Sequence, residues 1–421
     1  MVEKDGARSR FRPDQREVGK INHALQSAAL LASDVRHPAW LGEDCPVEDV
    51  RQLIACKNGL LHFPSGKLFN HDPRFWSHNV LPFEYDPAAQ CQRWIQFLEE
   101  ILPGDTKAHE TTQEIFGLCL TDETRFQKSF LFYGPKRSGK GTIGRVLRQL
   151  VGVDNYVGPT LAGFVKQFGM QSWIGKKVSV FSDARLGHAN VMATERFLSI
   201  TGEDPLDIDR KYLPAWTGIL STRIIVLTNE LPKFEDDSGA LPSRFIVVQL
   251  RESFFGREDI DLTEKLVAEL PGILNWAREG WNRLAKRRQF EQPESGREAA
   301  ESLRIIGSKI SAFVEELCEL GPQYEIGITE LHQAFSKYLA LHNLRTSLTV
   351  HHFSGQLKAA YSSIETERPR SDDPKRPRNF IGIRLKQPAA AQPALKTVKS
   401  TPEPILDEPV SNVVRMLPAR R

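Results

Sequence analysis

The stretch Ser129-Phe-Leu-Phe-Tyr-Gly-Pro-Lys-Arg-Ser-Gly-Lys-Gly-Thr-Ile-Gly-Arg-Val-Leu147 carries the main indications of how this chain folds. Its apolar run Phe130 to Tyr133 predicts a buried strand. After a glycine-rich turn, apolar side chains recur at the spacing of one helix face, at Ile143, Val146, Leu147 and Leu150. Strand, glycine-rich turn and amphipathic helix in this order predict an α/β core.

The turn has the pattern Gly134-x-x-x-x-Gly139-Lys140 of a phosphate-binding loop, in which backbone N–H groups surround phosphates at a helix N-terminus. The bare pattern is weak, and the alternative is an ordinary glycine-rich turn, but the strand before it and the helix after it favour ATP binding. The residue after Lys140 is Gly141 where the pattern has Ser or Thr, so the role of the next hydroxyl, on Thr142, as a magnesium ligand stays open. The residues expected to bind the nucleotide are Gly134, Pro135, Lys136, Arg137, Ser138, Gly139, Lys140, Gly141 and Thr142.

Composition sets broad limits on the protein. A length of 421 residues allows two or three domains, and 56 Lys+Arg against 53 Asp+Glu neither demands nor excludes nucleic acid. The five cysteines are odd in number and widely spaced, which predicts free, buried thiols in a reducing compartment. No apolar stretch is long enough for a membrane span, and the charged N-terminus is not a secretory signal, so we expect a cytoplasmic protein without a membrane partner.

The next strong strand pattern, residues 177–183, ends on Asp183. A carboxylate at the end of a strand beside a phosphate-binding loop is well placed to hold magnesium. The alternative, an aspartate that begins a surface turn, is less favoured once the loop upstream is considered. No second carboxylate follows Asp183, so the base that activates water is left open between Glu195, Glu203 and Asp204.

Two further apolar runs predict strands at residues 223–229 and 245–250. The first ends on Asn229, whose amide is suited to position water or sense the outer phosphate; the alternative is a cap of the turn before Pro232. Arg244 precedes the second strand and is a candidate arginine finger toward its own or a neighbour's nucleotide. A lone arginine at a strand edge is otherwise solvated.

Six motifs in fixed order resemble the helicase part of phage and plasmid primase-helicases, which belong to helicase superfamily 3. They are 134–142, Phe181-Ser-Asp183, Ser199–Pro205 with Asp209–Tyr212, Leu227–Pro232, Ser238–Phe245 and Pro271–Trp276. The resemblance covers roughly residues 40–385. It implies an ATPase core of the AAA+ type that forms a ring, usually a hexamer, and moves along single-stranded or forked DNA. About 35 residues before the cap are too few for a polymerising domain, so we expect any primase to be a separate chain.

By position, the resemblance implies that Lys140 and Thr142 contact phosphates, with Asp183 serving Mg²⁺. Asn229 would be the sensor and Arg244 the finger from the adjacent subunit. Arg210 and Lys211 match a hairpin that faces the ring channel, where basic side chains suit contacts to the DNA backbone. The alternative for this pair is a solvated loop.

The expected fold is therefore α/β, with a P-loop AAA+ type core, a mixed α/β and helical N-terminal region and a C-terminal winged-helix-like domain. The expected boundaries are an N-terminal extension (1–35), a cap and helical collar (36–125), an ATPase core with a helical lid (126–285), an exposed connector (286–304), the winged-helix-like domain (305–386) and a disordered tail (387–421).

The winged helix is inferred from three helical faces, a strand at 380–385 and a basic turn with Arg368, Arg370, Lys375, Arg376 and Arg378. Its third helix would read the major groove. A protein-docking module is the alternative.

Three functions remain after this comparison of patterns. The first is an ATP-driven replicative DNA helicase, and the second is a replication initiator that uses ATP as a switch. The third is a small-molecule kinase, since Gly139-Lys140-Gly141-Thr142 also resembles the loop of nucleoside monophosphate kinases. Those enzymes lack the later strand that ends Thr228-Asn229 and the C-terminal helix-turn-helix, so the kinase is the least favoured.

Overall fold

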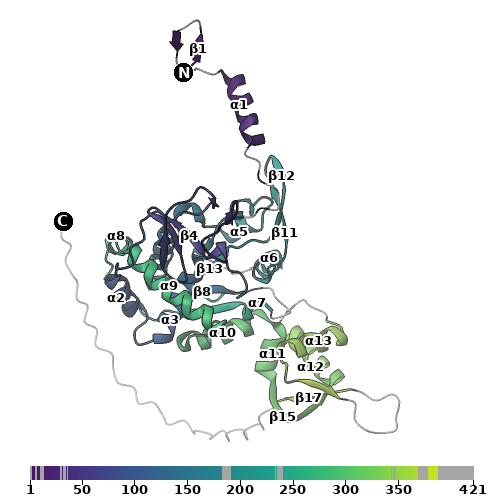
Figure 1. Cartoon of the computed structure of the whole chain (residues 1–421). Coiled ribbons are helices and arrows are strands. Elements are labelled where there is room, and N and C mark those ends of the chain that lie inside the picture. Colours follow the sequence, from purple (N-terminus) through teal and green to yellow (C-terminus); the bar gives the residue numbers. More distant parts are fainter. Residues whose placement is uncertain are drawn as a thin grey trace, which may run out of the picture.

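A computed structural model describes residues 2–4, 7–9, 14–28, 31, 35, 37–182, 191–232, 234, 240–342, 344, 348–367 and 378–386. Strands β1 (Val2–Lys4) and β2 (Ala7–Ser9) pair antiparallel, and helix α1 (Gln15–Ala28) follows them. Helix α1 buries none of its side chains and extends away from a central α/β body, while a smaller C-terminal unit lies on the other side of that body (Figure 1).

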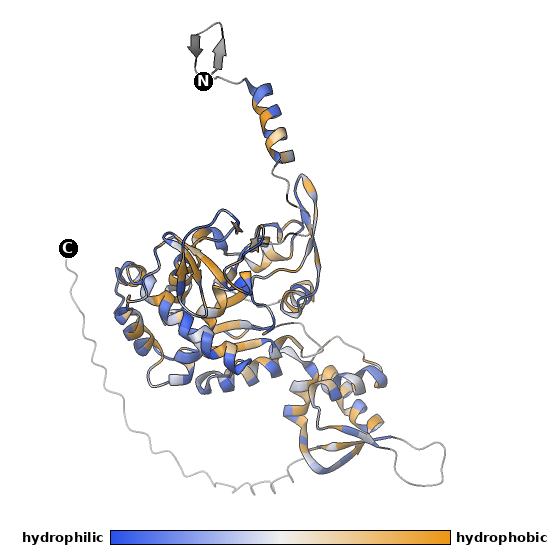
Figure 2. Ribbon diagram, in the orientation of Figure 1, coloured by the Kyte–Doolittle hydropathy of each residue, from blue (hydrophilic) through white to orange (hydrophobic). Residues whose placement is uncertain are grey.

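Five parallel strands form the central sheet, in the spatial order β14-β8-β13-β10-β9. Their bounds are β8 (Ser129–Tyr133), β9 (Tyr156–Val157), β10 (Val178–Ser182), β13 (Arg223–Thr228) and β14 (Phe245–Gln249). The four apolar runs predicted as strands are all in this sheet, so that prediction is confirmed. Continuous apolar runs are expected here, because both faces of a parallel sheet are covered. Figure 2 shows these strands as largely hydrophobic.

Successive residues of the strands point into two separate cores. Phe130 and Phe132 lie in one core with residues of α2, α3, α4 and α9, while Leu131 lies in the other with residues of α5, α6 and α10. The bounds of these helices are α2 (Gln92–Ile101), α3 (Thr106–Cys119), α4 (Lys140–Val151), α5 (Leu161–Phe164), α6 (Val191–Gly202), α9 (Leu270–Arg287) and α10 (Glu294–Gly307). The sheet is thus held between two apolar layers, and burial of each phenylalanine contributes about 1.5–3 kcal/mol.

Short connecting elements complete the body. The chain contains the 3-10 turns η2 (Val153–Asn155) and η3 (Gln171–Trp173), and the helices α7 (Ala240–Ser243) and α8 (Leu262–Val267). Strands β11 (Leu206–Arg210) and β12 (Leu213–Gly218) form an antiparallel hairpin apart from the central sheet. The helices predicted within residues 262–284 are present as α8 and α9, which we call the lid helices, with Pro271 in the first turn of α9, where a missing N–H costs little.

The region before α2 contains the short strands that the sequence predicted. Strands β4 (Leu53–Cys56), β5 (Gly59–His62) and β6 (Lys67–Phe69) form one antiparallel sheet, preceded by the turn η1 (Val50–Gln52). Strands β3 (Ala39–Trp40) and β7 (Phe75–Trp76) form a second. The described cysteines are free, and four of the five are buried.

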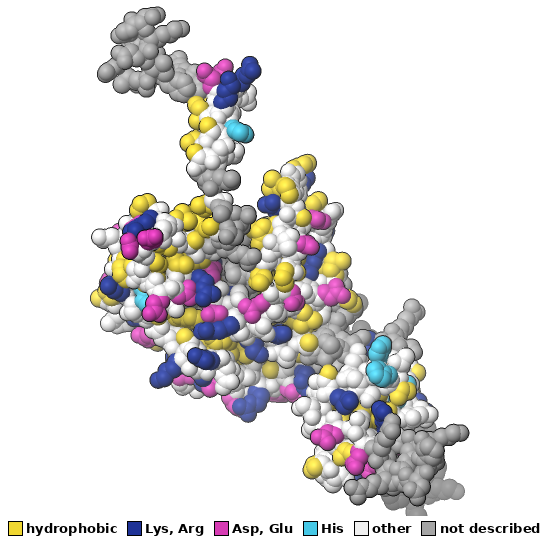
Figure 3. Space-filling view, turned by 45° about the vertical axis from the view of Figure 1, so that its right-hand side comes forward, with side chains coloured by type: hydrophobic (Ala, Val, Ile, Leu, Met, Phe, Trp, Pro, Cys, Tyr) yellow, Lys and Arg dark blue, Asp and Glu magenta, His cyan; other side chains and the backbone are white. Residues whose placement is uncertain are grey.

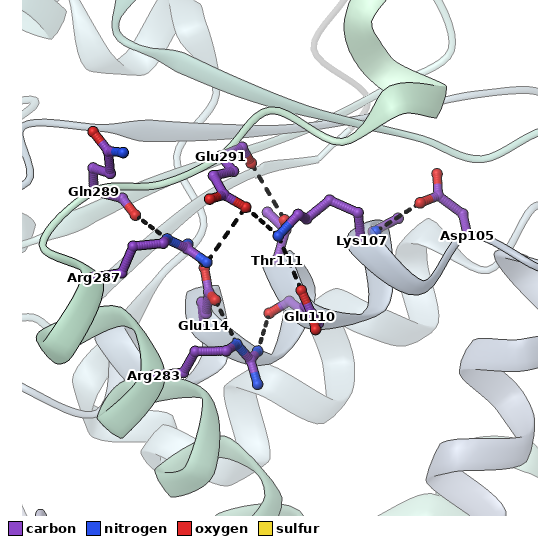
Figure 4. Close-up of polar contacts among 10 residues, drawn as sticks. Asp105, Lys107, Glu110, Thr111, Glu114, Arg283, Arg287, Gln289 and Glu291 are labelled. Atoms are coloured by element: carbon purple, nitrogen blue, oxygen red, sulfur yellow. Dashed lines mark hydrogen bonds and ion pairs between the residues drawn. The ribbon is translucent and has the colours of Figure 1, made fainter.

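Helices α3 and α9 approach closely through glycine. A Cβ on Gly117 would lie 2.4 Å from the carbonyl oxygen of Ala277, and one on Gly280 would lie 2.5 Å from that of Gln113. Beside this contact, the carboxylate of Glu114, 1% exposed, accepts from Arg283 Nε at 2.8 Å and from Arg287 Nη2 at 2.5 Å (Figure 4). Helix α3 of the collar is therefore fixed to the lid.

The expected exposed connector at 286–304 is wrong, because much of it is α10. This helix buries Ala299 and Leu303 against the sheet. The amide of Gln292 accepts from the N–H of Val247 at 3.0 Å and donates to its carbonyl at 2.6 Å, which satisfies both backbone groups of Val247 on the free edge of β14. The many charged residues of this stretch made its apolar face hard to recognise in the sequence.

The C-terminal unit has its own core. It contains α11 (Lys309–Leu317), β15 (Cys318–Gly327), α12 (Ile328–Leu341), α13 (Val350–Ala360), β16 (Glu365–Glu367) and β17 (Asn379–Leu385). The strands form an antiparallel sheet in the order β15-β17-β16. The three predicted helices and the last strand are confirmed, and β15 was missed. Most of the expected basic turn, and the tail from residue 387, lie outside the described residues.

Candidate functional site

A cleft of about 830 Å³ opens at the carboxyl ends of the central strands. The chain leaves β8 for the side of β9, returns through β10 and β13, and then crosses to β14 beyond β8. Ligands of open α/β sheets bind where the strand order reverses in this way. The cleft is lined by the predicted loop from Lys136 to Thr142, by Ser182 after β10 and by Thr228 and Asn229 after β13.

The glycine-rich loop is held in shape by backbone geometry and by its neighbours. Gly139 has φ +92°, and a Cβ there would lie 2.9 Å from Cγ2 of Ile101 on α2. A Cβ on Gly134 would lie 2.3 Å from the carbonyl oxygen of Leu250. The N–H of Phe254 donates to the carbonyl of Arg137 at 2.9 Å. Both glycines therefore permit close backbone approach, and the loop ends at the N-terminus of α4.

Lys140 lies in the cleft with only 8% of its surface exposed. Its ammonium donates to the carbonyls of Gly134 at 2.8 Å and Pro135 at 2.6 Å, and to the Ser138 hydroxyl at 2.9 Å. Phosphate oxygens are stronger acceptors for an ammonium than carbonyls are. The lysine is therefore already positioned where a phosphate on this loop would lie.

The structure brings Thr142 and Asn229 to the same cleft as Lys140. The buried Thr142 hydroxyl accepts from Arg145 Nη2 at 2.9 Å, and the loop joins β13 through the bond from Gly134 N–H to the carbonyl of Thr228 at 3.3 Å. Asp183 lies outside the described residues, although Ser182 before it lines the cleft. The metal role of Asp183 stays a prediction.

The cleft has a cationic part and an apolar part. Its described lining includes six Lys or Arg side chains against three carboxylates. The cations are Arg93, Lys136, Arg137, Lys140, Arg145 and Arg257, and the carboxylates are Glu100, Glu258 and Asp259. Phe97, Ile101, Phe254, Ile260 and Leu262 supply the apolar surface. An excess of positive charge next to apolar walls suits a ligand that joins a polyanion to a flat ring.

The predicted candidates for the water-activating base are not brought to this cleft. Glu195, Glu203 and Asp204 are all missing from its lining, and Glu203 accepts from Thr124 and Gln127 elsewhere. Each carboxylate that does line the cleft among the described residues is paired with a cation: Glu100 with Arg93 at 3.2 Å, Glu258 with Arg137 at 3.3 Å, and Asp259 with Lys265 at 2.8 Å.

Sequence patterns missed several residues of the cleft. Arg93 and Glu100 come from α2, and Arg257 from the segment after β14, so their arrival depends on tertiary packing. Arg145 had a local signal, because it follows Thr142 by three residues on the same helix and such residues are neighbours on a helix surface.

Arg244 lies at the amino ends of the strands, on the opposite side of the sheet from the cleft. It precedes β14, its carbonyl accepts from the N–H of Ser129 at 2.8 Å, and its guanidinium donates to Gln127. The length of β8, roughly 13 Å at about 3.3 Å per residue, separates this side from the loop. Arg244 therefore does not reach the cleft of its own chain.

Lys128 lies beside Arg244, with its ammonium 2.7 Å from the carbonyl of Ser243. Burial lowers the pKa of Lys128, and the positive charge of Arg244 lowers it further. Neither cation forms an ion pair with a carboxylate of the described residues. Two neighbouring, half-buried positive charges therefore lie at the amino ends of the strands.

Arg210 and Lys211 lie at the turn of the β11–β12 hairpin, as the resemblance implied for a hairpin at this place. Arg210 Nε donates to the carbonyl of Pro214 at 2.8 Å. Next to them, Tyr212 is 91% exposed, with Lys211 Nζ 5.0 Å from its ring centroid. The hairpin projects from the body (Figure 1), and Figure 3 shows hydrophobic and basic side chains together on it.

Two family models match parts of this chain. Residues 26–103 match "D5 N terminal like", and residues 132–244 match a "Family of unknown function (DUF5906)". The second match runs from the strand before the loop to Arg244. Neither match covers half of the chain.

Among solved structures, the chain is similar to the C-terminal region of NrS-1. The A-form apo structure has 14% identity over 87% of this chain and 90% of that chain, with a TM-score of 0.47. Another apo structure of that region, residues 305–718, has 13% identity over the same shares and a TM-score of 0.48. No helix in the described part of the chain is long and apolar enough to cross a membrane.

Proposed function

We propose that this protein is an ATP-dependent DNA helicase of phage or plasmid replication, with a superfamily 3 core of the AAA+ type. The observation that carries the proposal is the cleft, where a glycine-rich loop, a buried lysine and an excess of cations meet at the reversal of strand order. The match of residues 26–103 to the D5 N-terminal-like family supports a role in phage replication, and the match to DUF5906 covers the loop and most of the motifs that carry the resemblance.

The cleft residues have distinct roles in this proposal. Loop N–H groups at the start of α4 and the Lys140 ammonium bind the phosphates, since a helix N-terminus favours anions. Asn229 orients water or senses the outer phosphate. Mg²⁺ bound with ATP neutralises charge on the outer phosphates, and Thr142 and Asp183 are the residues that would hold it. The cleft volume of about 830 Å³ is within the range of small-molecule sites.

The position of Arg244 supports hydrolysis between subunits. Arg244 lies at the amino ends of the strands, away from its own cleft, so it would contact a nucleotide only in the cleft of another copy. A contact that joins opposite ends of neighbouring chains is head-to-tail, and such contacts form a ring when the rotation between neighbours closes. The half-buried cations Lys128 and Arg244 would then meet the triphosphate of the adjacent subunit, as an arginine finger does.

The β11–β12 hairpin is the proposed DNA contact in the ring channel. Its tip combines Arg210 and Lys211 with an exposed tyrosine, and basic and aromatic side chains together bind single strands with little sequence preference. The C-terminal unit has the order of helices and strands of a winged helix. Most of its basic turn lies outside the described residues, whereas the hairpin is described in full, so the hairpin is the DNA contact that we propose.

Hydrolysis of ATP by the full chain, with and without single-stranded DNA, tests the proposal. We expect strong stimulation by DNA, loss of turnover in Lys140→Ala, and retained basal turnover without stimulation in Lys211→Ala. Unwinding of a forked duplex would complete the case. ATP binding with turnover that no DNA changes would reject the helicase and favour the ATP-switched initiator. No ATP binding would reject both.

A further inference from the structure

The side chain of Arg145 lies in the part of the cleft next to the phosphate-binding loop. Its Nη2 donates to Thr142 Oγ1 at 2.9 Å, and its Nε donates to Thr263 Oγ1 on α8 at 3.1 Å. Long side chains on a helix point back over the preceding turn. The guanidinium of Arg145 is therefore held over the first turn of α4, where the loop meets the helix.

Gly141 is the reason that the guanidinium has room there. A Cβ on Gly141 would lie 3.2 Å from Arg145 Nη1, tighter than most carbon contacts. The sequence pattern of the loop has a hydroxyl residue at this position, and this chain has none. The guanidinium of Arg145 therefore occupies space that a side chain at position 141 would need.

The side chain of Arg145 is exposed at the cleft, where its charge is open to an anionic partner. The N-terminus of a helix carries a partial positive charge, which disfavours a cation in its first turn. Arg145 forms no ion pair with a carboxylate of the described residues, and both of its hydrogen-bond partners are neutral hydroxyls. A phosphate in the cleft would supply the missing negative charge.

We propose that Arg145 is a phosphate-binding residue of the cleft, which uses the space that Gly141 leaves open. This inference rests on the proposed nucleotide binding and adds a second cation of the same chain to Lys140. The bonds to Thr142 and Thr263 use two of the five N–H donors of the guanidinium, so three donors, including both on Nη1, are left for a phosphate.

Binding of three probes to the full chain tests the proposal by calorimetry: a non-hydrolysable ATP analogue, inorganic tripolyphosphate and adenosine. We expect Arg145→Gln to raise the Kd of the analogue and of tripolyphosphate by the same factor, about 10-fold to 100-fold, since that is the usual worth of a hydrogen bond to a charged group. Arg148→Gln is the matched control. Arg148 lies on the same helix outside the cleft lining, so both values of Kd should stay unchanged.

Gly141→Ser provides a second test, which does not depend on the loss of a charge. In the wild-type background the new side chain should displace the guanidinium and weaken tripolyphosphate binding. In the Arg145→Ala background the serine has space, so the same change should be neutral or should improve binding. Such coupling is expected only for residues in contact.

The outcomes separate this inference from the proposed function. If the wild-type chain binds neither the analogue nor tripolyphosphate, nucleotide binding itself fails. If the wild type binds both and Arg145→Gln leaves the Kd of tripolyphosphate unchanged, only the role of Arg145 is overturned. Equal effects of Gly141→Ser in the two backgrounds would also reject the arrangement.

Discussion

At the scale of single residues, the buried carboxylate of Glu114 is the strongest electrostatic link between the collar and the lid. Its side chain is 1% exposed, and it accepts from Arg283 and Arg287 of α9 (Figure 4). Removal of one partner of a buried ion pair costs about 3–5 kcal/mol, which is an upper limit here because both arginines are partly exposed and Arg287 keeps Glu291 at 3.6 Å. We expect Glu114→Ala to lower the midpoint of thermal unfolding strongly, as measured by calorimetry or circular dichroism.

Glu110→Ala is the matched control for that substitution. Glu110 lies one turn earlier on α3, and its carboxylate pairs with Lys107 at 3.0 Å, with both side chains more than a third exposed. Exposed pairs contribute about 0–1 kcal/mol. The control should unfold near the wild-type temperature. Similar losses in both variants would show that the pair with Glu114 adds nothing beyond the loss of a glutamate from α3.

His37 gives a prediction for pH. Its ring packs edge-on against Trp76 and His78, and burial lowers its pKa below 6.5; Lys177 and His78 lower it and Asp122 raises it. The unfolded chain therefore binds a proton at a higher pH than the folded chain, and stability rises with pH across this window. On acidification the loss begins near pH 6.5, the ordinary histidine value, and is complete below the folded pKa.

The measurement for His37 is the unfolding temperature between pH 7.5 and 5.5. His37→Phe should lose less stability on acidification than the wild type, because the titrating ring is gone while the aromatic packing is kept. His71→Gln, at an exposed histidine, should keep the wild-type slope. A wild-type slope in His37→Phe would contradict the linkage.

The sequence predicted the cleft residues that belong to the loop or to neighbouring strands, and it missed those that come from distant segments of the chain. Lys140 and Thr142 were found because the loop is one continuous motif. Asn229 was found because β13 lies parallel to β8, so both strands end on the same side of the sheet. Arg93 and Arg257 were missed, since no local period reports which distant segments will pack against the loop. The position of Arg244 depends on the sheet, in which β14 runs parallel to β8 and begins at the end away from the loop.

At the scale of elements, the contact between α10 and β14 depends on a glycine. A Cβ on Gly296 would lie 2.0 Å from the carbonyl oxygen of Val247. We expect Gly296→Ala to push α10 from the sheet and to destabilise the chain by about 1–3 kcal/mol or more, as overpacking does. Gly355→Ala is the control in α13, with no atom within 4 Å of the new Cβ, and should stabilise by about 0.5–1 kcal/mol.

Urea or thermal unfolding of the two glycine variants measures these effects. If Gly296→Ala is as stable as the wild type, α10 is not packed on β14 as described. This helix also shows why elements can be missed from sequence. Its buried face consists of Gly296, Ala299, Leu303 and Gly307, three of them too small to produce a clear apolar period. The strands of the central sheet, with long continuous apolar runs, were predicted correctly for the opposite reason.

At the scale of the whole molecule, the distance between Arg244 and its own cleft makes the proposed hydrolysis a property of two chains. Lys140→Ala removes the lysine from a cleft, and Arg244→Ala removes the finger supplied to the neighbouring cleft. Each variant alone should be inactive. In a mixture, a cleft with Lys140 intact from an Arg244→Ala chain can receive the finger of an adjacent Lys140→Ala chain, so activity should return.

The expected yield of this complementation follows from counting interfaces. In a ring assembled at random from equal amounts, half of the clefts keep Lys140 and half of those have a neighbour with Arg244, so about a quarter of the wild-type turnover is expected for head-to-tail contacts. Turnover per chain should also rise with protein concentration. Arg244→Ala that stays active by itself, or mixtures that remain inactive although the chains assemble, would show that Arg244 does not act across a subunit boundary.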